Sequence, residues 1–287
     1  MTTDRQAPAV PAAERFDTPP LDQEPPKPPL RRRVLGAIRT YWPTALLLVI
    51  LVLFWQWAVS FFNVPDYVFA SPSQIWTSIH ENWSFILASA VWTTLSEVLI
   101  GFGLSVVVGI GIATLLHWSN ILRRVVYPLL IASQTVPIVV IAPILAIIFG
   151  YSLLPKVLLV ALVCFFPIVV NTLDGFSSTD PQLLRVMKTL DGTKWGAFRK
   201  IEFPASLPSM FSGLRVAATY AAIGAVFGEY GGSQNGLGYV IIQATPQLQT
   251  ALVFASIVLL SVMSMLLFLA VSLLERVVAP WAREGMK

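Results

Sequence analysis

The sequence predicts an all-α protein that crosses a membrane about six times, and three observations predict it. The first is composition: the 287 residues are 56% hydrophobic and 12% charged, with a mean hydropathy of +0.73. These values exclude an ordinary soluble domain. The second is a series of apolar stretches, most of about 20 residues, the length that a helix needs to cross about 30 Å of hydrocarbon. The third is the distribution of basic residues between those stretches.

The apolar stretches give the order of the predicted spans. Residues 85–118 are more than one span needs, so the first turns of that helix should lie outside the hydrocarbon or the helix should tilt. Residues 157–173 are near the short limit. We expect spans at 44–62, 85–118, 125–151, 157–173, 209–228 and 248–274.

Basic residues predict the orientation. Of the 19 Lys and Arg residues, all but Lys156 and Arg215 precede the first span, follow the last, or lie in the connections 117–124 and 174–208. Arg215 is just inside the fifth span on that same side. Because Lys and Arg are retained on the cytoplasmic side, both termini and these two connections should be cytoplasmic, with Lys156 on the outer side.

The chain divides into a tail and a membrane domain. Residues 1–40 contain eight prolines by Pro29 and show no apolar period, which predicts a disordered cytoplasmic tail. The first apolar run begins only at Thr44 and is a full span in length, so no cleavable signal peptide is expected. Residues 41–287 should form the transmembrane domain.

The connection 174–208 is predicted to contain two short amphipathic helices. Asp180 can cap a helix whose first residue is Pro181, the dipeptide Asp191-Gly192 breaks the chain into a turn, and Thr193 can cap the second helix. Apolar residues share one face of each helix, and in the second helix this face lies opposite Arg199. The apolar positions are Leu183, Leu184, Met187, Leu190, Trp195 and Phe198. Apolar faces outside the bilayer predict a partner.

Polar residues inside the spans are candidates for the lining of a passage. Gln134, Thr135 and Pro137 lie where proline interrupts the backbone hydrogen bonds of the third span, an arrangement tolerated at depth only against protein or a water-filled cavity. A packing kink is the competing interpretation. Glu97 is the ionisable residue inside the second span, with a structural or a pathway role. Glu229 begins a glycine-rich outer segment that we expect to be a flexible loop, either a gate or a turn.

Other chemistries have little support. His80 and His117 flank different ends of the second span, so no metal site is expected, and no phosphate-binding P-loop is present. Cys164 lies in a span as a structural thiol. No basic stripe carries stacking aromatic residues, so no nucleic-acid binding is expected. An intramembrane enzyme would need a nucleophile and base, and a secondary transporter would need no docking helices.

The connection 174–208 resembles the cytoplasmic signature of permease subunits of bacterial ABC importers, the binding-protein-dependent transport system inner-membrane family. That signature reads E-A-A, three residues, G, nine residues, I-x-L-P. Here its positions fall at 185–187 (Arg185, Val186, Met187), Asp191 and 201–204, which ends at Pro204. The spacing is intact. The leading acid is replaced by a base, both alanines by larger residues, and the glycine by Asp191, with Gly192 beside it. The similarity extends from about Pro72 to Arg276.

The resemblance implies the fold of a type I ABC importer permease, a multi-pass protein of the bacterial cytoplasmic (inner) membrane. It implies two cytoplasmic ATPase subunits, an extracytoplasmic substrate-binding protein and a second permease copy as a homodimer. No cofactor would be bound by this chain, because ATP and Mg belong to the ATPase. The ATPase-docking residues would be Leu183, Leu184, Arg185, Met187, Lys188, Leu190, Asp191, Gly192, Trp195, Phe198, Arg199 and Pro204.

The branch of the family that this chain resembles moves sulfonates, taurine, nitrate, pyrimidine thiamine precursors or riboflavin. Fixed positive charge is scarce along the predicted pathway, since only Lys156 and Arg215 lie outside the cytoplasmic segments. This scarcity favours a neutral heterocycle, such as a pyrimidine thiamine precursor or a flavin, met by Gln134 and Thr135. A sulfonate, taurine or nitrate is the alternative, because helix N-termini can hold an anion. A secondary transporter is the more distant alternative for the function of the chain.

Overall fold

The computed structural model describes residues 30–190 and 192–281, with side chains from residue 42 onward. The chain forms two compact units, 1–53 and 54–287. In the first unit the helix α1 begins at Leu30 and runs on into the second unit, to Phe61. The structure therefore differs from the predicted tail 1–40 at the carboxyl end of that tail, because residues 30–40 are the first turns of α1. Residues 1–29 lie outside the described residues.

Residues 30–190 and 192–281 form helices and the connections between them, and they contain no β-strand. This confirms the predicted all-α class. In the second unit two π-helical turns, η1 and η2, join α-helices end to end. The elements are α2 (Pro72–Asn82), η1 (Trp83–Leu87), α3 (Ala88–Trp118), α4 (Asn120–Ser133), α5 (Ile138–Phe149), α6 (Leu153–Ser177), α7 (Pro181–Thr189), α8 (Lys194–Ala197), η2 (Phe198–Glu202), α9 (Phe203–Tyr230), α10 (Leu237–Ala244) and α11 (Thr250–Val278).

Five of the predicted spans correspond to long apolar helices, and the third does not. The stretch 125–151 is broken into α4 and α5, which meet at an angle of 98°. The physical cause is local: Gln134 and Thr135 close short i→i−3 hydrogen bonds, and Pro137, which has no N–H, then starts a new helix. The described residues thus hold five candidate spans, or six if the bent pair is one.

Long helices form the core of the second unit. Helices α6 and α9 pack along each other, with α3 against α6 and α11 against α9. A Cβ added to Gly101 would lie 2.5 Å from Cβ of Val160, and one added to Gly109 would lie 2.9 Å from Ile168 Cγ2, so these glycines let α3 approach α6. Gly101, Ser105, Gly109 and Ala113 recur every four residues along α3, and all four are buried.

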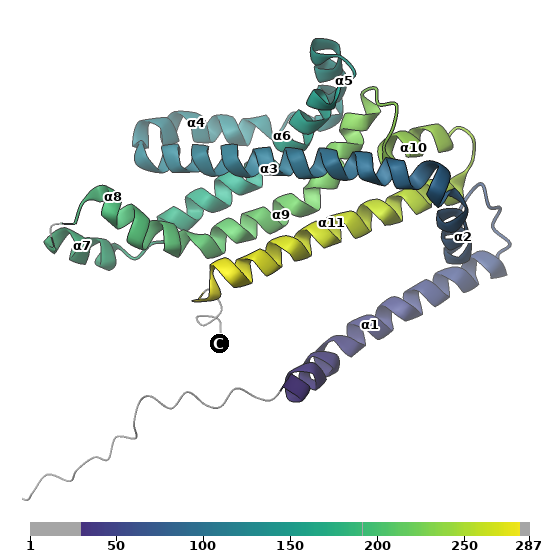
Figure 1. Ribbon diagram of the computed structural model, residues 1–287, viewed down its shortest axis with the longest axis horizontal. Helices are drawn as coiled ribbons and strands as arrows, with labels where there is room; N and C mark the ends of the chain where they lie inside the picture. Colours follow the sequence, from purple (N-terminus) through teal and green to yellow (C-terminus); the bar gives the residue numbers. More distant parts are fainter. Residues whose placement is uncertain (1–29, 191, 282–287) are drawn as a thin grey trace, which may run out of the picture. The chain divides into compact units, whose positions relative to one another are not determined.

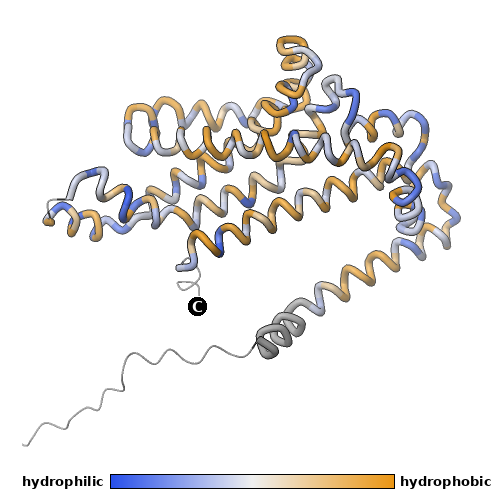
Figure 2. The backbone as a smooth tube through the Cα atoms, in the orientation of Figure 1, coloured by the Kyte–Doolittle hydropathy of each residue, from blue (hydrophilic) through white to orange (hydrophobic). Residues whose placement is uncertain are grey.

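The hydrophobic residues follow the shafts of the long helices, and hydrophilic ones collect in the connections at the two ends (Figure 2). At one end lie α7, α8 and the carboxyl end of α3, and at the other lie α2, α10 and the amino end of α3 (Figure 1). By the distribution of basic residues, the first end is the predicted cytoplasmic end and the second the outer end.

Candidate docking loop, transport groove and buried charge network

The two helices predicted in the connection 174–208 are present, with the predicted caps. Oδ1 of Asp180 accepts a hydrogen bond from the backbone N–H of Gln182 at 2.7 Å, and Pro181 is the first residue of α7. Oγ1 of Thr193 accepts from the N–H of Gly196 at 3.1 Å and caps α8. α8 is short and continues through η2 into α9, so the loop is joined without a break to a long core helix.

Gly192 makes the turn between α7 and α8 possible. Its N–H donates to the carbonyl oxygen of Met187 at 2.9 Å, and a Cβ at position 192 would lie 2.7 Å from that same oxygen. The family signature has its glycine one position earlier, where this chain has Asp191, which lies outside the described residues. The steric need for a glycine is therefore met by the following residue.

Replacing Gly192 by alanine should distort the turn and lower the Tm of the purified protein by several degrees, because the carbonyl of Met187 belongs to the backbone and cannot move aside cheaply. The matched control is Gly196→Ala in α8, where the nearest atom is the movable Oγ1 of Thr193 at 3.2 Å. That variant should retain the wild-type Tm. Equal Tm values for the two variants would contradict the steric role of Gly192.

The loop presents an apolar surface to its surroundings. Leu183, Val186, Leu190 and Trp195 are each more than half exposed. The basic residues beside them are also exposed: Arg185, Lys188, Lys194, Arg199 and Lys200. Exposed apolar side chains fringed by charge are typical of a protein-docking surface.

Other residues of the predicted docking set turn inward. Leu184 and Met187 are half-buried and line a hollow of about 290 Å³ with the end of α3, and Pro204 is partly buried in the first turn of α9. Phe198 is only 8% exposed, in a cluster with Phe176 and other core residues. Its ring stacks on that of Trp195. The apolar pattern of the sequence places both rings on one face, and it does not show that core residues cover Phe198 and leave Trp195 exposed.

A hydrogen bond that the sequence did not predict ties this loop to α3. Nε2 of His117, in the last turn of α3, lies 3.0 Å from Oε2 of Glu202, the last residue of η2. The His117 ring packs against Phe176 with their centroids 4.8 Å apart. The residues are 85 positions apart in the sequence, and no local pattern links them.

The break between α4 and α5 forms one wall of a groove of about 620 Å³, with α6 and α9 as the others. Gln134 and Pro137 line this groove, whereas Thr135 does not: its hydroxyl donates to the carbonyl oxygen of Ala132 at 2.8 Å. The sequence did not single out three further polar residues in the lining, Ser133 on α4, Asn171 on α6 and Tyr220 on α9. None of the described residues that line the groove is charged.

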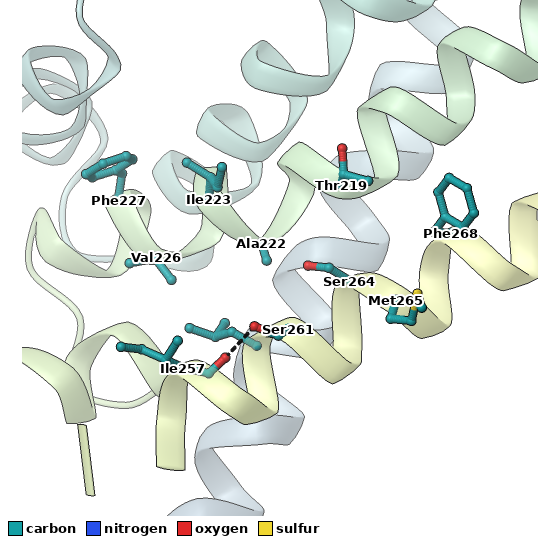
Figure 3. A pocket seen from close by; sticks show the side chains of 11 residues that line it. Thr219, Ala222, Ile223, Val226, Phe227, Ile257, Ser261, Ser264, Met265 and Phe268 are labelled. Carbon is teal, nitrogen blue, oxygen red and sulfur yellow. Dashed lines mark hydrogen bonds between the residues drawn. The ribbon is translucent and has the colours of Figure 1, made fainter. Parts of the chain in front are cut away.

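A second groove, of about 680 Å³, lies between α9 and α11 (Figure 3). Its lining is almost entirely apolar and includes Val226, Phe227 and Phe268. One of its few hydroxyls, that of Ser261, is already bonded to the carbonyl of Ile257 in its own helix at 2.8 Å. This lining suits lipid or another helix better than a polar solute.

Glu97 and Glu229, the two acids considered for the pathway, are buried within this chain. They are 0% and 1% exposed. Nζ of Lys156 lies 3.0 Å from Oε1 of Glu97 and donates to Oγ of Ser233 at 2.7 Å. Oγ1 of Thr94 donates to Oε1 of Glu229 at 2.6 Å. The network joins α3, α6 and α9 at the predicted outer end.

The glycine-rich segment after α9 is built around the Glu229 carboxylate. The N–H groups of Gly238 and Tyr239, at the start of α10, donate to Oε2 of Glu229. Gly236 has a φ of 123°, and a Cβ there would lie 2.2 Å from Cδ of Glu229. The segment was expected to be a flexible loop, but these glycines make room for a carboxylate that caps a buried helix.

Comparison with known proteins identifies the family. A family model described as "Binding-protein-dependent transport system inner membrane component" matches residues 105–284. The formylaminopyrimidine transport permease ThiX of Halalkalibacterium halodurans is 38% identical over 84% of this chain and 96% of its own length. The riboflavin transport system permease RibX of Chloroflexus aurantiacus is 31% identical over 87% of this chain and 94% of its own length.

A putative aliphatic sulfonates transport permease, SsuC of Bacillus subtilis, is also 31% identical, over 87% of this chain and 91% of its own. Among solved structures, a chain from an inward-facing conformation of the MetNI methionine ABC transporter matches the fold with a TM-score of 0.60. It is 18% identical, and the match covers 67% of this chain and 95% of that one. The chain therefore belongs to the binding-protein-dependent transport system inner-membrane component family, as a multi-pass permease subunit of an ABC importer.

Proposed function

We propose that this permease carries a small neutral heterocycle, of the aminopyrimidine type from which thiamine is made, along the groove between α5, α6 and α9. The observation that carries the proposal is the lining of that groove. It combines the amides of Gln134 and Asn171, the phenol of Tyr220 and the ring of Phe166 with no charged side chain among the described residues.

These groups match the chemistry of an aminopyrimidine. Nδ2 of Asn171 donates to the carbonyl of Pro167 at 2.8 Å, and no described residue bonds its side-chain oxygen, which is left to accept from an amino group. An amide or a phenol donates to ring nitrogens, and an aromatic ring stacks on the heterocycle. The name of the relative from Halalkalibacterium halodurans, a formylaminopyrimidine permease, supports this class of solute.

A sulfonate or taurine is the second candidate, and one observation favours it. α5 begins on the wall of the groove at Ile138, and no side chain caps its first turn. Free N–H groups at a helix N-terminus hold anions without a basic residue. The sulfonate permease among the relatives supports this alternative. The neutral class is preferred because the lining offers no Lys or Arg to accompany those N–H groups.

The assembly belongs to the same proposal. Two copies of this chain would form the pathway, and a second copy would close the open side of each groove. Two ATPase subunits would each take the exposed face of Leu183, Val186, Leu190 and Trp195 into a cleft. ATP and Mg would be bound by those subunits, this chain would bind no cofactor, and an extracytoplasmic binding protein would deliver the solute.

Uptake of labelled formylaminopyrimidine in a strain lacking this permease tests the substrate. The wild-type gene should restore uptake, while Gln134→Leu and Tyr220→Phe should each raise KM up to about 10-fold, the cost of one lost hydrogen bond. The matched control is Thr135→Val, beside Gln134 but outside the lining. It should leave KM unchanged.

Restored uptake of taurine or an alkanesulfonate, with formylaminopyrimidine uptake absent, would replace the neutral class by the anion. Formylaminopyrimidine uptake that is unaffected by Gln134→Leu and Tyr220→Phe would keep the substrate and remove the groove from the pathway.

A further inference from the structure

Helix α3 is attached to the docking loop at its carboxyl end, although α4, α5 and α6 lie between the two in the sequence. The attachment consists of the His117–Glu202 hydrogen bond at 3.0 Å and of Trp118, whose ring centroid lies 5.7 Å from that of Trp195 and 5.3 Å from that of Phe198. The side chains of His117 and Glu202 are 19% and 16% exposed, so separating them would leave a largely buried carboxylate without its partner.

At its amino end the same helix holds the start of α10. Oγ1 of Thr94 donates to Oε1 of Glu229 at 2.6 Å and accepts from the N–H of Leu237, the first residue of α10, at 2.9 Å. One turn further on, Glu97 pairs with Lys156. Thr94 therefore ties α3 at once to the end of α9 and to the first turn of α10.

The helix between these two attachments is suited to transmit movement. At 1.5 Å per residue, the segment from Thr94 to His117 is about 35 Å long, more than the hydrocarbon thickness of a bilayer. α3 contains no proline, whereas α6 contains Pro167 and α9 contains Pro208. Proline is the commonest cause of a kink, so α3 is the stiffer connection between the ends.

We infer that α3 transmits conformational change between the ATPase-docking loop and the outer element α10, with His117 and Thr94 as the positioning residues at its two ends. The inference rests on the proposed docking of an ATPase at α7 and α8, but not on the identity of the solute. Nucleotide binding inside then alters α10 outside, and by reciprocity occupation of α10 by a partner alters nucleotide affinity.

The test measures a change at α10 caused by nucleotide at the ATPase. Cysteine is placed at the exposed Gln234, in the turn before α10, in a chain carrying Cys164→Ser, and the permease–ATPase complex is reconstituted in liposomes. The rate of labelling by a membrane-impermeant maleimide is compared without nucleotide and with ATP, Mg²⁺ and vanadate. We expect the rate to change about 5-fold or more, the lower end of ordinary allosteric coupling.

His117→Ala and Thr94→Val should each abolish this change while the complex still assembles and hydrolyses ATP. The matched control is Thr114→Val, the same substitution on the same helix, where the hydroxyl bonds only to the carbonyl of Ile110. It should retain the change. His117→Gln, which keeps an N–H donor for Glu202, should restore most of it and excludes a mere loss of folding.

A full change of labelling rate in His117→Ala or Thr94→Val would overturn the inference, as would no change in the parent chain while ATP is hydrolysed. Loss of the change in Thr114→Val as well would also overturn it. Failure of the ATPase to co-purify with the parent chain would instead refute the docking proposal, and the inference with it.

Discussion

Trp195→Asp should give a permease that inserts and accumulates normally but no longer retains its ATPase. Trp195 is 58% exposed, so the change leaves the buried core in place, although it removes the ring contacts with Phe198 and Trp118. In a docking cleft the new carboxylate would be desolvated without a partner, at several kcal/mol, which lowers affinity by about 100-fold or more. The measurements are membrane abundance by immunoblot and the ATPase recovered with the tagged permease.

Phe198→Asp, three residues away, should have a different result. Phe198 is buried against Phe176 and its neighbours, so replacing its ring by a carboxylate removes aromatic packing and buries an unpaired charge. Together these changes should cost about 3–5 kcal/mol of folding free energy. That variant should fail to accumulate, and Phe198→Leu should be tolerated. Normal abundance of Phe198→Asp, or normal ATPase recovery with Trp195→Asp, would contradict this division of the loop.

The second large effect is expected at Lys156. Lys156→Met removes the cation that lies 3.0 Å from Glu97 and leaves that buried carboxylate without a partner. Breaking a buried ion pair in this way costs about 3–5 kcal/mol, which should lower the Tm of the purified permease by roughly 10 °C.

A second substitution should reverse much of that loss. Glu97→Gln in the Lys156→Met background removes that unpaired carboxylate, while Glu229 keeps its hydrogen bonds from Thr94 and from α10. The double variant should be more stable than Lys156→Met alone. Lys200→Met, at an exposed lysine of the docking loop, is the control and should leave the Tm unchanged. A double variant less stable than Lys156→Met would show that the charges are not coupled.

The sequence predicted what depends on local rules. Asp180, Pro181 and Thr193 start their helices because capping involves residues two or three positions apart, and the apolar runs reported all of the long helices except the third. The break at Gln134–Pro137 was visible as polar residues beside proline. Its angle was not, because the chemistry of a break does not determine which way the next helix turns.

Contacts between residues that are far apart in the chain could not be predicted from the sequence. Glu229 and Thr94 are separated by 135 positions, and nothing near either residue indicates the other. The glycines after Glu229 indicated a turn, but not that a carboxylate would occupy the space they leave. The same holds for the docking face. Trp195 and Phe198 belong to the same apolar pattern, but tertiary packing covers Phe198 and leaves Trp195 exposed.

The burial of Lys156 has a consequence for how this importer responds to ionic strength. At the predicted outer end of the second unit, the described residues expose the acids Asp66 and Glu81 but no Lys or Arg, since Lys156 is enclosed. A run of glutamines, including Gln243, Gln247 and Gln249, is exposed there instead. A partner that meets this surface would face neutral amides and only these two acids, so its association rate should depend only weakly on salt.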